Sequence, residues 1–255
     1  MVLSAEVRFA FSATARRCYD PPVMERPKHP LFVPGLLVAA AAAVCAWDVT
    51  LAETLYRAET AHIRPVRNVL NNLEPFGHGV GVVAIALVVW RLDRQALVRV
   101  PAVLGAALGG GLLADLVKLF VGRTRPRDFD FASDATIATF EGWLPELFGS
   151  GASHSFPSAH CATAAGLAYA LSRFYPRGTA VFWALFVGVA GHRINSGAHY
   201  LSDVLVGTAV GHFGGWLACD SPLALAVRRR LERRGPAVVR HPDLERFTGV
   251  DTDAA

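Results

Sequence analysis

Residues 98–126 read VRVPAVLGAALGGGLLADLVKLFVGRTRP, a largely apolar run that ends in a group of cations. A helix needs about 20 mostly apolar residues to cross the hydrocarbon layer of a membrane, and residues 98–119 supply them. Lys118 and Arg125 are seven residues apart, which over two helical turns places them on roughly the same face. Pro126 disfavours helix at the residue before it. The stretch therefore predicts a transmembrane helix with a cationic end.

Similar apolar runs recur along the chain of 255 residues, which is 53% hydrophobic and only 18% charged. The charged fraction lies below the roughly 25% of soluble domains. We expect an all-α, polytopic membrane protein with about six transmembrane helices in a bundle, five or seven being the alternatives. The expected spans are approximately 31–49, 77–92, 98–119, 159–174, 179–194 and 199–219.

The distribution of basic residues predicts the orientation of these spans. Most of the 25 lysines and arginines fall on one side of the membrane if the N-terminus is cytoplasmic, as the positive-inside rule requires. We therefore expect a multi-pass protein of the plasma membrane with both termini cytoplasmic. The expected parts are a polar N-terminal segment (1–30), a membrane domain (31–219) and a basic cytoplasmic tail (220–255).

The basic tail predicts contact with anionic lipids at the cytoplasmic face. The chain has a formal net charge of +4, and the arginine run 228–230 directly follows the last apolar segment. That position is typical of juxtamembrane lipid contact, and we expect no nucleic-acid partner. Glycines at 207, 211 and 215 indicate close helix packing within the chain, with a homodimer as the alternative.

A second cluster, Pro157-Ser158-Ala159-His160, opens the fourth apolar segment. Proline suits the first position of a helix, and the unpaired N–H groups there bind anions. The amides of Ser158 and Ala159, together with the Ser158 hydroxyl, are therefore candidate donors to phosphate oxygens. An ordinary capping serine and a structural histidine are the alternatives for this cluster alone.

A third cluster, Arg193-x5-His199-x3-Asp203, surrounds the start of the sixth segment. Residues four apart share a helix face, so we expect Asp203 to accept a hydrogen bond from one nitrogen of His199. The other nitrogen would then carry a lone pair, as a nucleophile requires. Arg193 would offer a forked donor to a phosphate.

Residue types that bind zinc lie in or next to these clusters: His154, His160, His192, His199 and Asp203. Lys118, Arg125 and Arg193 argue against a cation, because they would repel it and attract an anion. A site in which these cations surround a phosphoryl group during its transfer explains the charges better than a zinc site does. We therefore expect no metal and no other cofactor.

Over residues 75–219 the three clusters resemble the signature of the type 2 phosphatidic acid phosphatase (PAP2) family, K-x6-RP, PSGH and SR-x5-H-x3-D. The resemblance implies six helices and a metal-free reaction at the outer membrane face. It implies that His199 is the nucleophile, that Asp203 orients it and that His160 protonates the leaving group. The residues that it implies for phosphate binding are Lys118, Arg125, Ser158, Ala159 and Arg193.

Two positions depart from the family pattern: Ala159 stands for the glycine and His192 for the serine before Arg193. Neither change removes a catalytic group, so the sequence predicts a lipid phosphate phosphatase that forms a phosphohistidine. A phosphotransferase with the same intermediate is the first alternative, and a transporter of organic phosphates is the second. The residues do not identify the lipid.

Overall fold

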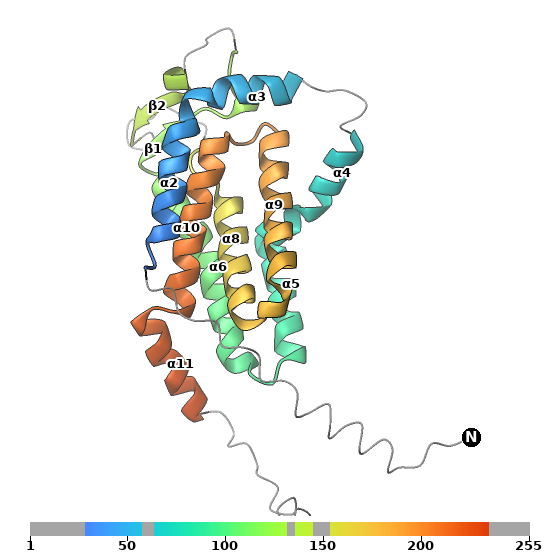
Figure 1. Ribbon diagram of the computed structural model, residues 1–255, viewed down its shortest axis with the longest axis vertical. Coiled ribbons are helices and arrows are strands. Elements are labelled where there is room, and N and C mark those ends of the chain that lie inside the picture. The colour runs from blue at the N-terminus through green and yellow to red at the C-terminus, as the bar shows by residue number, and fades with distance from the viewer. Residues whose placement is uncertain (1–28, 58–63, 132–135, 145–153, 235–255) are drawn as a thin grey trace, which may run out of the picture.

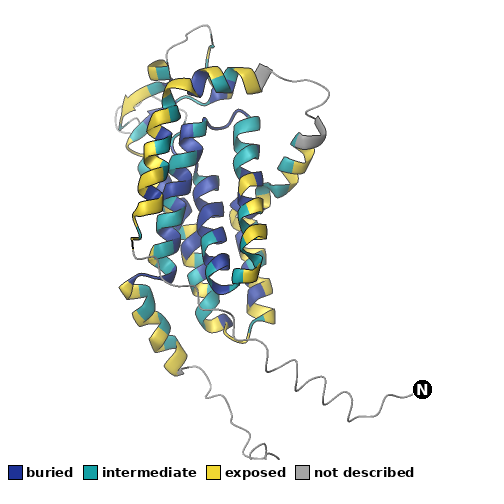
Figure 2. Ribbon diagram, viewed as in Figure 1, coloured by how far each residue is buried: buried dark blue, intermediate teal, exposed yellow. Residues whose placement is uncertain are grey.

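The computed structural model describes residues 29–57, 64–131, 136–144 and 154–234, and the fold is mainly helical (Figure 1). Three helices form its centre: α6 (Ala96–Lys118), α8 (Ala159–Phe174) and α10 (Leu201–Cys219). These three pack on one another more extensively than any other elements. Of the three, α8 is buried along almost its whole length (Figure 2), as expected of a helix that is apolar on every side.

Glycines on α10 allow this close packing. A Cβ atom at Gly207 would lie 2.4 Å from the Ser158 carbonyl oxygen, and one at Gly211 would lie 2.1 Å from the Ala162 carbonyl oxygen. Both distances are far below van der Waals contact, so only glycine lets α10 approach α8 this closely. The expectation that these glycines pack helices within one chain is confirmed.

Further helices surround this centre. Helix α2 (Phe32–Val44) packs on α10, α9 (Thr179–Asn195) on α8, and α5 (Gly79–Leu92) on α6. Helix α4 (Arg64–Leu73) lies against α9 and leads through the short 3-10 helix η2 (Glu74–Gly77) to α5. Helix α11 (Pro222–Arg234) follows α10 within the expected tail.

One end of the bundle is covered by irregular structure and α3 (Asp48–Arg57), which lies across it (Figure 1). Strand β1 (Val121–Arg123) pairs antiparallel with β2 (Phe140–Trp143). Short 3-10 helices η1 (Cys45–Trp47), η3 (Pro126–Asp128), η4 (Thr136–Thr139) and η5 (Pro176–Gly178) complete the described elements. The all-α expectation is therefore corrected by one small sheet at this end.

Two described helical stretches, Phe32–Leu55 and Ala96–Lys118, are long and apolar enough to cross a membrane. Arg67–Gly77 and Gly79–Leu92, bent by 66°, make a third if they form one span. The expected spans at 159–174, 179–194 and 199–219 are the helices α8, α9 and α10. Because α8 and α9 have only 16 and 17 residues, length alone does not identify them as spans, and the number six stays a prediction. Residues 1–28 and 235–255 of the expected terminal segments lie outside the described residues.

Candidate active site

The residues of the three clusters lie where helices begin and end at the covered end of the bundle. Lys118 is the last residue of α6, Arg193 lies in the last turn of α9, and His160 is the second residue of α8. His160 lies within electrostatic range of Arg193, His199 and Lys118. The structure thus brings groups from all three clusters into one site.

The start of α8 is fixed to the start of α10 by the backbone of Ser158. Its N–H donates to the backbone oxygen of Asp203 at 3.1 Å, and its hydroxyl caps α8 by accepting from the Cys161 N–H at 3.4 Å. The expectation that the Ser158 amide binds phosphate is therefore wrong for this conformation. The hydroxyl proton of Ser158 and the first-turn amide of Ala159, which has no acceptor inside the helix, are the donors that remain.

His199 lies in the loop between α9 and α10, not on a helix face shared with Asp203, because α10 begins only at Leu201. Its Nδ1 atom is 2.6 Å from the carbonyl oxygen of Ser155 and 3.8 Å from Asp203 Oδ2. Only the shorter distance is a hydrogen bond. The expected direct bond between Asp203 and the imidazole is therefore corrected to a bond from the Ser155 backbone.

This contact determines which nitrogen of His199 can react. A carbonyl oxygen only accepts, so Nδ1 carries the proton and Nε2 carries the lone pair in the neutral ring. Burial lowers the pKa of His199 below its ordinary value, although Asp203 acts in the opposite direction. Burial thus favours the neutral imidazole, whose Nε2 atom carries the free lone pair.

Asp203 holds the loop that presents His199. Its Oδ2 atom accepts from the Ser155 hydroxyl at 2.6 Å and from the Tyr200 amide at 2.9 Å. The Ser155 amide in turn donates to the backbone oxygen of Arg123 at 3.0 Å. Asp203 therefore orients His199 indirectly, by fixing the residue whose carbonyl oxygen binds the imidazole.

Arg123 is the main feature of this site that the motifs do not reveal. Its guanidinium is fully buried, forms ion pairs with Asp203 and Asp48, and donates to Thr139 Oγ1 at 3.0 Å and Ser202 Oγ at 2.8 Å. Burial alone lowers the pKa of Arg123, but the two carboxylates outweigh it and raise the pKa above its ordinary value. The only sign of this role in the sequence is that Arg123 is itself a basic residue between Lys118 and Arg125.

The cations expected to bind phosphate are placed differently from Arg123. Arg193 Nη1 is 3.1 Å from Glu74 Oε1, and Lys118 Nζ is 2.9 Å from Asp115 Oδ1. The Glu74 side chain is partly exposed, by 37%, and that of Asp115 is exposed by 62%. Arg125 is half-buried in extended backbone just before η3 and lies within electrostatic range of Arg193. The site therefore gathers several cations beside two histidines.

Comparison with known proteins connects this arrangement with phosphatases. Residues 99–224 match the PAP2 superfamily. Proteins named lipid A 1-phosphatase from Rhizobium etli and Rhizobium johnstonii are 36% and 34% identical over 116 residues, which is 46% of this chain. The matched region is 46% and 43% of their lengths, so the chain spans about half the length of the curated relatives it matches.

Two solved structures share the fold. Aquifex aeolicus LpxE has a TM-score of 0.53 and 18% identity, with coverage of 68% of this chain and 95% of that one. A transmembrane PAP2-type phosphatidylglycerolphosphate phosphatase from Bacillus subtilis has a TM-score of 0.50 and 17% identity, with coverage of 75% and 94%. At these identities the similarity establishes the fold alone.

Proposed function

The chain belongs to the PAP2 superfamily through residues 99–224, and on this basis we propose that it is a membrane phosphatase that removes a terminal phosphate from a lipid without a metal. The single observation that carries the proposal is the hydrogen bond from His199 Nδ1 to the Ser155 carbonyl oxygen. That bond supplies a neutral imidazole with its Nε2 lone pair free, beside cations that attract phosphate.

The proposed reaction has two steps. His199 Nε2 attacks phosphorus, the bond from phosphorus to the leaving oxygen breaks, and His160 gives that oxygen its proton. A water molecule then attacks phosphorus and gives one proton to His160, the bond from phosphorus to His199 Nε2 breaks, and inorganic phosphate leaves the regenerated imidazole. Lys118, Arg125 and Arg193 neutralise the charge that the phosphoryl group spreads over its oxygens.

The names of the relatives indicate which substrates to test first. The 1-phosphate of lipid A has priority because the two curated relatives are named for it. Phosphatidylglycerol phosphate follows from the Bacillus subtilis structure, whose title names that lipid. Phosphatidic acid and a polyprenyl diphosphate complete the panel.

The test is phosphate release by the purified protein from this panel, with EDTA present. We expect EDTA-resistant release that is lost in His199→Ala and retained in His192→Ala, a control that removes a buried imidazole with no part in the proposed steps. Release that persists in a folded His199→Ala protein would contradict the nucleophile. A phosphorylated acceptor with little free phosphate would favour phosphotransfer.

We also propose that the site faces the outer side of the plasma membrane, with both termini cytoplasmic, because the basic residues are distributed as the positive-inside rule predicts. Trp143 in β2 is 77% exposed at the covered end of the bundle. A membrane-impermeant thiol reagent added to intact cells should therefore label a Trp143→Cys variant. Labelling only after the membrane is opened would reverse the orientation.

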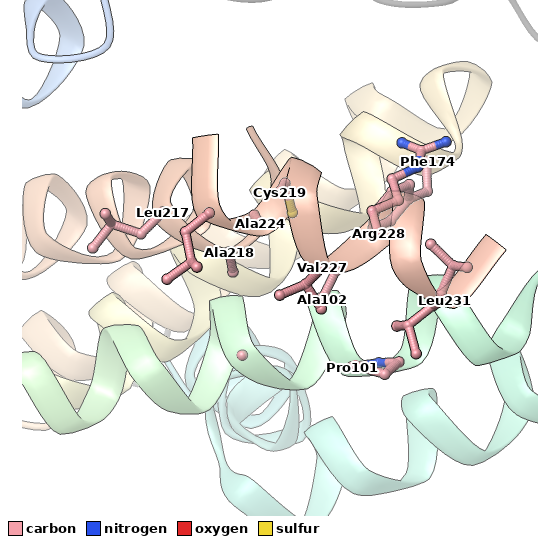
Figure 3. A pocket seen from close by; sticks show the side chains of 13 residues that line it. Pro101, Ala102, Phe174, Leu217, Ala218, Cys219, Ala224, Val227, Arg228 and Leu231 are labelled. Carbon is pink, nitrogen blue, oxygen red and sulfur yellow. The ribbon is translucent and has the colours of Figure 1, made fainter. Parts of the chain in front are cut away.

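Helix α11 supports the proposal that anionic lipids bind at the end of the bundle opposite the candidate active site. A cavity of about 260 Å³ lies between α11 and the ends of α6 and α10, with Leu217, Val227, Leu231 and Arg228 in its wall (Figure 3). The neighbouring arginines at 229, 230 and 233 are exposed. Native mass spectrometry should show preferential retention of phosphatidylglycerol over phosphatidylcholine, and equal retention would contradict the proposal.

Because Gly207 and Gly211 face α8 of the same chain, a homodimer would need another surface.

A further inference from the structure

Glu74, the first residue of η2, contacts two residues to which the proposed reaction gives different tasks. Its Oε1 atom is 3.1 Å from Arg193 Nη1 and 3.6 Å from His160 Nε2. Arg193 is proposed to hold the phosphate, and His160 is proposed to protonate the leaving oxygen. One carboxylate oxygen of Glu74 therefore lies between the phosphate-binding cation and the proton donor.

The substrate group that must touch both of these residues is the phosphate ester itself. One of its free oxygens would bind Arg193, and its leaving oxygen would face His160. A carboxylate oxygen and a phosphate oxygen are both anionic acceptors that bind guanidinium in the same way. Building on the proposed function, we propose that Glu74 occupies the position of the substrate phosphate and determines which phosphates can enter the site.

The structure allows this side chain to leave while its backbone stays in place. A Cβ atom at Gly77 would lie 2.8 Å from the His160 carbonyl oxygen, so η2 is packed tightly on the first turn of α8. The ring of His78, which follows η2, lies 5.8 Å from the ring of His160. The Glu74 side chain is nevertheless 37% exposed, and rotation about its own bonds can turn it toward solvent.

Because a substrate must displace Glu74, the site discriminates between lipid phosphates and free phosphate. Any entering phosphate must break the charge-assisted bond between Glu74 and Arg193 and then tolerate a carboxylate nearby. A lipid substrate can offset this cost with contacts of its remaining parts, whereas inorganic phosphate has none. Glu74 therefore weakens inhibition by the product and favours phosphate attached to a lipid.

The first measurement is binding of inorganic phosphate to the purified full-length protein in detergent, by isothermal titration calorimetry. Glu74→Gln keeps the size of the side chain and removes its charge. We expect its Kd for inorganic phosphate to fall about tenfold, the effect of one hydrogen bond to a charged group. The matched control is Asp128→Asn, which removes an exposed carboxylate 3.6 Å from Arg127 on the same end of the bundle and should leave the Kd unchanged.

The second measurement is lipid phosphate hydrolysis with added inorganic phosphate, where Ki in Glu74→Gln should fall by the same factor as Kd. An unchanged or weaker phosphate affinity in this variant would overturn the proposal. So would a tenfold loss of kcat with unchanged phosphate binding, because Glu74 would then orient His160 instead. If no lipid is hydrolysed but Glu74→Gln still tightens phosphate binding, the role of Glu74 stands and the phosphatase proposal fails.

Discussion

Replacement of Arg123 by methionine tests whether the buried charges hold the covered end of the bundle together. Arg123→Met preserves most of the apolar volume but leaves Asp48 and Asp203 buried without their cation, all three side chains being 0% exposed. Breaking a buried ion pair by removing one partner costs about 3–5 kcal/mol. For a protein of this size we expect a fall in Tm of roughly 6–20 °C, measured by thermal unfolding in a single detergent.

The matched control is Arg228→Met. Arg228 Nε is 2.8 Å from Glu232 Oε1, the same distance as that between Arg123 Nη2 and Asp48 Oδ2, but the two side chains are 39% and 50% exposed. An exposed pair of this kind on one helix contributes about 0.3–0.5 kcal/mol, so Tm should hardly change. The contrast isolates burial as the cause.

A double-variant cycle with Asp48→Asn then tests the pairing itself. Because Asp48 is costly only when Arg123 is missing, the double variant should be less destabilised than the sum of the two single variants, by about 1–3 kcal/mol. It should remain less stable than the parent, since Asp203 keeps its charge. Additive effects, or a loss in Arg123→Met no larger than that in Arg228→Met, would refute the reasoning.

Two further predictions concern helix packing and the protonation of the proposed nucleophile. Gly211→Val should prevent folding, because even its Cβ atom would lie 2.1 Å from the Ala162 carbonyl oxygen, whereas Gly109→Val should be tolerated since nothing lies within 4 Å; size-exclusion chromatography in detergent distinguishes the two. NMR titration of labelled histidine should show a His199 midpoint below the ordinary value, because burial lowers its pKa. As pH falls below about 6.5 the unfolded chain then binds a proton that folded His199 does not, so stability should decrease; a His199 midpoint at or above 6.5 would contradict this.

The sequence predicts helices well where an apolar run has a clear start signal. Residues 159–174 were expected to form one segment, and α8 runs from Ala159 to Phe174 with Ser158 as its cap. Residues 179–194 likewise correspond to α9, Thr179–Asn195. In both cases the apolar run has a sharp boundary, a capping serine before α8 and the Pro176-Arg177-Gly178 turn before α9, so local chemistry suffices.

The geometry of His199 and Asp203 was mispredicted because two local features of the loop were not considered. Gly197 has φ +63°, a left-handed conformation that glycine adopts readily, and it separates α9 from the next helix. Asp203 is the third residue of α10, where a carboxylate is favoured because it can bind amides at the helix start. Its Oδ2 atom accepts from the Tyr200 amide and lies 3.8 Å from His199 Nδ1, beyond hydrogen-bond distance.

The partners of Arg123 and Arg193 could not be predicted from spacing. Asp48 lies 75 residues before Arg123, and Glu74 lies 119 residues before Arg193. Asp48 lies at the end of the expected span 31–49, and Glu74 lies between that span and the next, at 77–92. Such contacts arise only when α3 and η2 pack on the ends of the central helices, and no local pattern specifies that packing.

The structure gives the two groups of cations partners of opposite character. Arg123 is bound to Asp48 and Asp203, carboxylates that are fully buried and that also accept bonds from Ser202, Ser155 or Tyr200. Arg193 is bound to the partly exposed Glu74, and Lys118 to the exposed Asp115. A phosphate can replace a solvent-accessible carboxylate at a lower cost than a buried one, because water solvates the displaced group, whereas displacement of a buried carboxylate also breaks its other bonds. Burial of the partner therefore distinguishes Arg123, which maintains the loop of His199, from the cations that we propose to bind the substrate phosphate.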